Sequence, residues 1–134
     1  MLGPIALDAT TVYFGHSIFY DGTAQRDGEI LACAKTGCAS APSLVATSAY
    51  GPQSLASDGI NVYWTELDSS LPYSTSGPYW LRKCAVAGCG DAPVTVASGL
   101  DGPIDLAVDH TYVYWTDSGG RDDGGYGRIW RAPK

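Results

Sequence analysis

Four cysteines carry the clearest chemistry in this chain of 134 residues. They form two Cys-x4-Cys pairs, Cys33 with Cys38 and Cys84 with Cys89. An even cysteine count in two similar local pairs predicts two disulfides and an oxidising compartment. Zinc would need four ligands that converge on one point, and no histidine recurs beside the pairs, so we expect no metal there. The protein is therefore expected to be secreted, periplasmic or on the cell surface, with a targeting segment upstream of this sequence.

Catalytic side chains are sparse. The two histidines are His16 and His110, and only His16 has a nearby carboxylate, Asp21, as a weak acid–base partner. Asp105 is an unusual polar residue among the strands expected to lie innermost. No nucleophile elbow, His-Glu-x-x-His zinc motif or phosphate loop is present. These observations favour a protein without enzymatic activity and without a cofactor.

The net charge of −6 bears on partners. Such a surface repels phosphate backbones, so we expect no nucleic-acid partner. No apolar run approaches the ~20 residues that span a bilayer. Calcium is compatible with this charge, and the carboxylates of Asp117, Asp122 and Asp123 form a weak candidate site, although their spacing does not match an EF-hand loop.

These side chains must be positioned by short strands. Val12-Tyr13-Phe14, Val62-Tyr63-Trp64 and Val113-Tyr114-Trp115 recur at intervals of 50 and 51 residues, each after a Gly-Pro dipeptide at 3–4, 51–52 or 102–103. Four apolar runs per interval, separated by turn residues, predict strands at 4–7, 12–14, 29–34, 43–46, 54–57, 62–65, 79–85, 94–97, 104–108, 113–116 and 127–132. An aspartate precedes each valine by four residues, and we expect Asp8, Asp58 and Asp109 to bond the backbone of a tight turn.

Val113-Tyr114-Trp115-Thr116-Asp117 resembles the second-strand motif of the YWTD-type β-propeller repeat, and Val62-Tyr63-Trp64-Thr65-Glu66 is a close variant. The Gly-Pro dipeptides and Cys-x3-Gly-Cys hairpins are similar to repeats of secreted bacterial propeller proteins. This resemblance implies an all-β propeller domain over 1–134, with blades at about 1–48, 49–98 and 99–134. It also implies that the Tyr-Trp-Thr residues are architectural.

The sequence thus predicts three blades, with four, four and three strands. A closed propeller usually has 4 to 8 blades. We therefore expect half of a six-bladed ring, completed either by a second copy of the chain or by the remaining blades of a longer protein.

The least similar segments are the loops expected at 15–28, 66–78 and 117–126, and variable loops on one rim often form a binding face. Their aromatic and polar residues favour a glycan or peptide ligand. The candidate binding residues are His16, Tyr20, Asp21, Glu66, Tyr73, Asp105, Arg121 and Tyr126. The function expected is an extracellular scaffold or binding module. The alternative, implied by other six-bladed propellers, is a hydrolase or lactonase with a metal in the central channel.

Overall fold

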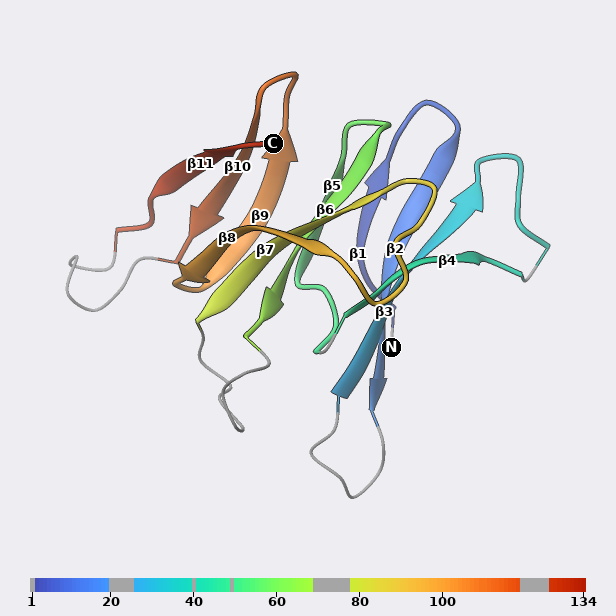
Figure 1. The fold of residues 1–134 in the computed structure, drawn as a ribbon, viewed down its shortest axis with the longest axis horizontal. Helices are drawn as coiled ribbons and strands as arrows, with labels where there is room; N and C mark the ends of the chain where they lie inside the picture. The colour runs from blue at the N-terminus through green and yellow to red at the C-terminus, as the bar shows by residue number, and fades with distance from the viewer. Residues whose placement is uncertain (1, 20–25, 40, 49, 69–77, 119–125) are drawn as a thin grey trace.

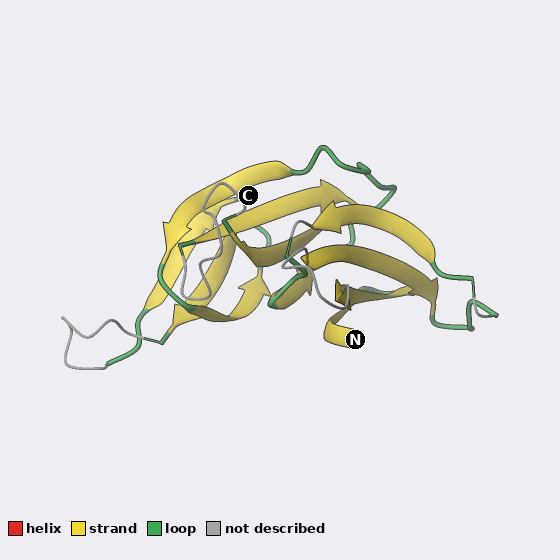
Figure 2. Ribbon diagram, turned by 90° about the horizontal axis from the view of Figure 1, so that it is seen from below, coloured by secondary structure: helices red, strands yellow, loops and turns green. Residues whose placement is uncertain are grey.

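The computed structural model describes residues 2–19, 26–39, 41–48, 50–68, 78–118 and 126–134. Within these ranges the protein consists of strands and loops, without a helix (Figure 2). The all-β prediction is therefore confirmed for the described residues. None of these ranges contains a helix long and apolar enough to cross a membrane.

The strands form three antiparallel sheets that lie side by side (Figure 1). The first sheet contains β1 (Leu2–Leu7), β2 (Thr11–Phe19), β3 (Arg26–Ala34) and β4 (Ser43–Ser48). The second contains β5 (Ser54–Ser57), β6 (Asn61–Leu67), β7 (Tyr79–Ala85) and β8 (Val94–Leu100). The third contains β9 (Pro103–Val108), β10 (Tyr112–Asp117) and β11 (Ile129–Pro133). Each expected strand overlaps one of these elements, and strands adjacent in sequence are adjacent in each sheet.

Two expectations about the segments between strands are wrong. β2 extends to Phe19 and β3 begins at Arg26, so His16 is a strand residue rather than part of a loop at 15–28. Glu66 likewise lies within β6. Polar residues such as His16, Ser17 and Glu66 interrupt the apolar runs at these strand ends. A search for apolar runs therefore does not detect the ends of the strands.

The first Gly-Pro dipeptide is also not equivalent to the other two. Gly51 and Gly102 have φ values of 77° and 52°, a region that favours glycine, and each precedes the first strand of its sheet. A Cβ at Gly51 would approach the Ser17 hydroxyl to 2.2 Å. Gly3-Pro4 instead lies inside β1, because Gly3 precedes Val12 by nine residues, whereas Gly51 and Gly102 precede Val62 and Val113 by eleven.

The turn between the first two strands is built in the same way in all three sheets. In the second sheet, Asp58 Oδ1 accepts hydrogen bonds from the backbone N–H groups of Ile60 and Asn61, at 2.9 and 2.7 Å, while Asp58 Oδ2 accepts one from the Tyr63 hydroxyl. The equivalent bonds of the other sheets join Asp8 to Thr10, Thr11 and Tyr13, and Asp109 to Thr111, Tyr112 and Tyr114. We call this arrangement the Asp–Tyr turn. It confirms the turn role expected for the three aspartates.

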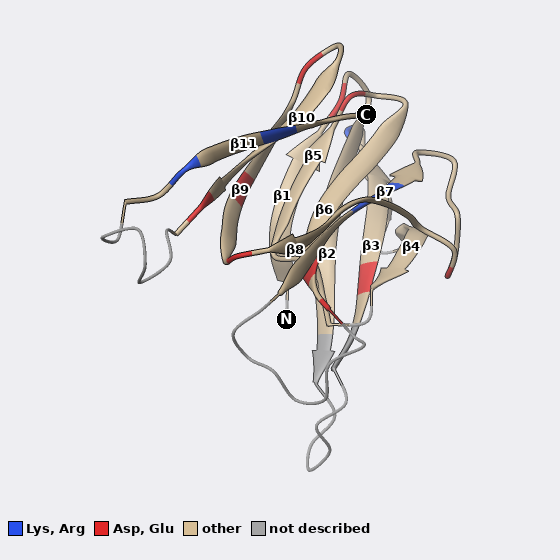
Figure 3. Ribbon diagram, turned by 60° about the vertical axis from the view of Figure 1, so that its left-hand side comes forward, with Lys and Arg blue, Asp and Glu red and all other residues tan. Residues whose placement is uncertain are grey.

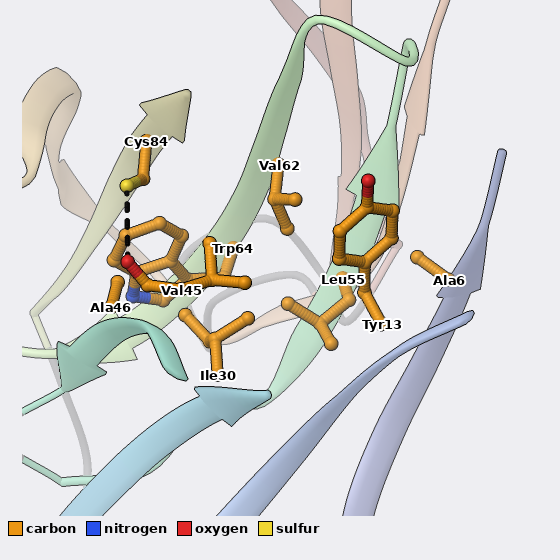
Figure 4. Packing of buried hydrophobic residues seen from close by; sticks show 9 residues of the cluster. All are labelled: Ala6, Tyr13, Ile30, Val45, Ala46, Leu55, Val62, Trp64 and Cys84. Atoms are coloured by element: carbon orange, nitrogen blue, oxygen red, sulfur yellow. Dashed lines mark hydrogen bonds between the residues drawn. The ribbon is translucent and has the colours of Figure 1, made fainter. Parts of the chain in front are cut away.

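Two hydrophobic clusters join the sheets face to face. At the first junction, Tyr13 and Ile30 of the first sheet pack with Leu55, Val62 and Trp64 of the second (Figure 4). At the second junction, Tyr63 and Leu81 take the places of Tyr13 and Ile30, and they pack with Leu106, Val113 and Trp115 of the third sheet. Along one strand, neighbouring residues therefore face opposite junctions, as the two-residue period of a strand requires.

The second disulfide lies at the first junction. Both expected bridges are present, Cys33–Cys38 and Cys84–Cys89. The Cys89 N–H donates to the Val45 carbonyl at 2.9 Å, and the Cys84 sulfur lies 3.4 Å from the same oxygen (Figure 4). Each bridge closes a short ring worth roughly 2 kcal/mol in the chain-entropy account. The second bridge also holds its hairpin against β4 of the neighbouring sheet.

Asp58 gives the protein an expected dependence of stability on acid pH. Burial raises the pKa of Asp58, but hydrogen bonds from Lys134 and from the backbone of Asn61 outweigh it and lower the pKa to about 2. A lowered pKa stabilises the folded state above pH about 4, and this contribution is lost as the pH falls through about 2. Asp58→Asn should therefore be about 2 kcal/mol less stable than the wild type at pH 7, with the gap closing toward pH 2.

Chemical denaturation at a series of pH values measures this gap. Asp8→Asn is the matched control, because Asp8 makes the same turn bonds without the further bond that Lys134 gives to Asp58. A gap for Asp58→Asn that stays constant between pH 7 and pH 2 would contradict the prediction.

Candidate functional site

An open cavity of about 250 Å³ lies between β8 and β11, at the edge where the second and third sheets meet. Ala97, Leu100 and Trp115 form part of its apolar lining. Trp130 lies in the same wall and is 44% exposed, which is high for an indole. The cavity therefore presents aromatic surface to solvent at a junction that is elsewhere closely packed.

Polar groups surround this aromatic surface. Asp117 Oδ2 accepts a hydrogen bond from Trp130 Nε1 at 2.5 Å, and Asp117 Oδ1 accepts one from the Arg128 N–H at 2.8 Å. The Arg128 guanidinium lies 5.9 Å from the centre of the Trp130 ring. Asp101 lines the opposite side. The Asp117 carboxylate thus fixes the orientation of an indole that stays partly exposed.

The equivalent place at the first junction is filled. There Glu66, at 2% exposure, accepts hydrogen bonds from the Ser48 hydroxyl at 2.5 Å and from Trp64 Nε1 at 3.0 Å. Its second oxygen accepts one from Arg82 Nε at 3.0 Å. Arg82 in turn lies 3.9 Å above the Trp80 ring. A carboxylate that binds an indole thus recurs at both junctions, but only at the second does it border open space.

Of the predicted binding residues that the structure describes, His16, Glu66 and Asp105 lie on three different sheets. His16 Nδ1 lies 3.5 Å from Glu29 Oε2, its cross-strand neighbour, and both side chains are about one-third exposed. Glu66 belongs to the buried network described above rather than to an accessible loop. Tyr126 is 79% exposed and precedes β11. Four of the predicted residues fall outside the described ranges: Tyr20, Asp21, Tyr73 and Arg121.

Asp105 lies on β9, the first strand of the third sheet. It pairs with Thr116, as Ser54 pairs with Thr65 in the second sheet, so Ser54 is its equivalent. Its side chain is exposed and Oδ1 accepts a hydrogen bond from the Leu106 N–H at 2.9 Å.

The described residues give little support to the calcium hypothesis. Both Asp117 oxygens accept protein hydrogen bonds, from Arg128 and Trp130. Asp122 and Asp123 lie outside the described ranges. Within those ranges, no group of three or more His, Cys, Asp or Glu side chains is placed to hold a metal ion.

Sequence reasoning missed Trp130 and Arg128 as candidate site residues. Trp130 lies in a predicted strand, where a tryptophan is expected to be core. Trp130 pairs with Trp115 across β10 and β11. Two tryptophans side by side on one face of a sheet form a large aromatic surface, and this is the signal that the sequence offered.

No protein-family model matches the chain, and comparison with curated proteins finds no match. The functional argument therefore depends on the sheets and on this cavity.

Proposed function

We propose that the three sheets are consecutive blades of a β-propeller and that the protein is an extracellular, non-catalytic binding module. Each sheet is an antiparallel meander, and the first strands lie next to one another, β1 beside β5 and β5 beside β9. First strands that face a common axis are what a radial array of blades requires. The two disulfides are typical of an oxidising compartment outside the cytosol.

The observation that supports ligand binding is the exposed Trp130 ring in the cavity between β8 and β11. Sugars bind proteins through flat apolar faces that stack on aromatic rings and through hydroxyls that bond carboxylates or guanidinium groups. The cavity offers both, with Trp130 and Trp115 beside Asp101 and Arg128. A glycan is the ligand class that this combination favours.

The cavity also lies at the edge where the variable loops begin. Asp117 ends β10, Arg128 immediately precedes β11, and Asp101 follows β8. This placement agrees with the expected binding rim, although Trp130 replaces the predicted loop residues as the central contact.

Binding to a glycan array, followed by calorimetric titration of the strongest hit, tests the proposal. Trp130→Ala should weaken binding about tenfold or more, because loss of one stacked ring costs on the order of 1–2 kcal/mol. Tyr112→Ala is the matched control, since Tyr112 lies at the opposite end of β10. Equal affinity of wild type and Trp130→Ala, or specific binding to peptides alone, would contradict a glycan site here.

A further inference from the structure

The two outermost faces of the sheet array carry exposed apolar side chains that the described residues do not cover. On the first sheet, Ile5 is 64% exposed and Leu7, Val12 and Phe14 share its face. On the third sheet, Ile129 is 77% exposed and shares its face with Tyr114 and Ala107, and also with the polar residues Asp105, Thr116 and Arg131. Exposed apolar surface of this kind marks an interaction site.

The two outer faces are the two halves of the junction that already occurs twice inside the chain. By strand register, Tyr114 and Ile129 occupy the positions of Tyr63 and Leu81, which face the third sheet at the second junction. The outer face of the third sheet is thus equivalent to the face that, at both inner junctions, packs against the following sheet.

The outer face of the first sheet is the complementary half. Ile5, Val12 and Phe14 occupy the positions of Leu55, Val62 and Trp64, which receive the preceding sheet at the first junction. A third-sheet face and a first-sheet face can therefore pack in the manner of the two inner junctions.

We propose that the outer face of the third sheet binds the outer face of the first sheet of a second copy, so that two chains close one ring of six sheets. The proposal rests on the radial arrangement of blades given under the proposed function, but on no ligand. Head-to-tail contacts close into a ring when each chain spans half of the circle, and both junctions are then identical by two-fold symmetry.

A charge pair supports a second copy as the occupant. At the second junction, Lys134 Nζ binds Asp58 Oδ2 of the preceding sheet at 2.6 Å. The backbone N–H of Lys134 bonds Thr111, and that of Lys35 bonds Thr10, the equivalent turn residue of the first sheet. Lys35 therefore occupies in the first sheet the position that Lys134 occupies in the third, and it is exposed.

The partner for Lys35 is present at the other end of the chain. Asp109 occupies in the third sheet the position that Asp58 occupies in the second. It accepts the same turn hydrogen bonds, and it is exposed. In the proposed ring, Lys35 of each copy lies where it can bind Asp109 of the other. Acidic residues lie in turns between strands, and basic residues lie on and next to β11 (Figure 3).

Light scattering and sedimentation of the purified, oxidised chain over a dilution series test the proposal, with a dimer as the expected species. Lys35→Glu should raise the dimer dissociation constant about tenfold or more, because it places a second carboxylate opposite Asp109. In an Asp109→Asn background the effect of Lys35→Glu should shrink, since the like-charge contact is gone while the Asn side chain retains the turn acceptor. Asp91→Lys, an exposed two-unit charge change in the β7–β8 hairpin, should leave the constant unchanged.

Ile129→Lys provides a second variant that does not depend on the charge pair. The Ile129 side chain is largely exposed, so the substitution should leave the fold and its circular dichroism unchanged while producing a monomer. A wild-type monomer at all concentrations, an open-ended series of larger species, or a dimer insensitive to both Lys35→Glu and Ile129→Lys would overturn the proposal. Glycan titration of Trp130→Ala in the dimer reports separately on the binding function.

Discussion

Replacing Glu66 with alanine is expected to lower the free energy of unfolding by about 3–5 kcal/mol. Glu66 is the acceptor for Ser48, Trp64 and Arg82 at the first junction. Removing the carboxylate leaves the Arg82 guanidinium, whose side chain is only 17% exposed, without its counter-ion. A buried charge that loses its partner is far more costly than an ion pair that is never formed.

Urea unfolding followed by tryptophan fluorescence measures this loss. Glu29→Ala is the matched control, because Glu29 also pairs with a basic residue but is 35% exposed, and its loss should stay below about 1 kcal/mol. Replacing Glu66 and Arg82 together with methionine should be less damaging than Glu66→Ala alone. Losses that simply add in the double variant would show that the two groups do not act as a pair.

Trp64→Ala is expected to be at least as destabilising, at about 3–5 kcal/mol. The Trp64 side chain is fully buried between the first two sheets, and its indole N–H is one of the donors to Glu66. Truncation removes the largest buried side chain of the first junction and leaves a cavity in a packed interface. The loss should appear as a lower urea midpoint, with the same probe or with circular dichroism.

Trp115→Ala is the variant with which the destabilisation caused by Trp64→Ala is compared. Trp115 occupies the same position at the second junction, but it borders the open cavity between β8 and β11. Trp115 is 9% exposed whereas Trp64 is fully buried, so Trp115→Ala should destabilise less than Trp64→Ala. Equal losses at the two positions would mean that the cavity is closed in solution.

Much of the local fold follows from the sequence. Short β-branched and aromatic runs predict all eleven strands of the described residues, and the Asp-to-Val spacing predicts the turn role of the three aspartates. These features depend on residues two to five positions apart, so a local pattern contains all the information. The Tyr partner of each aspartate was available from the same five-residue spacing and was missed.

The contacts between neighbouring sheets are of another kind. Ser48 meets Glu66, and Lys134 meets Asp58 across 76 positions, because neighbouring sheets bring them together. No local periodicity encodes such pairs.

The Asp–Tyr turn bears on the order in which the molecule folds. Its hydrogen bonds join residues two, three and five positions apart, for instance Asp8 to Thr10, Thr11 and Tyr13. Closing such short loops costs little chain entropy, and contacts of low sequence separation form quickly. Each hairpin thus contains its own starting point, whereas Lys134 and Asp58 can meet only after two sheets have docked. The three Asp–Tyr turns can therefore act as independent folding nuclei, so that each sheet forms before the sheets dock.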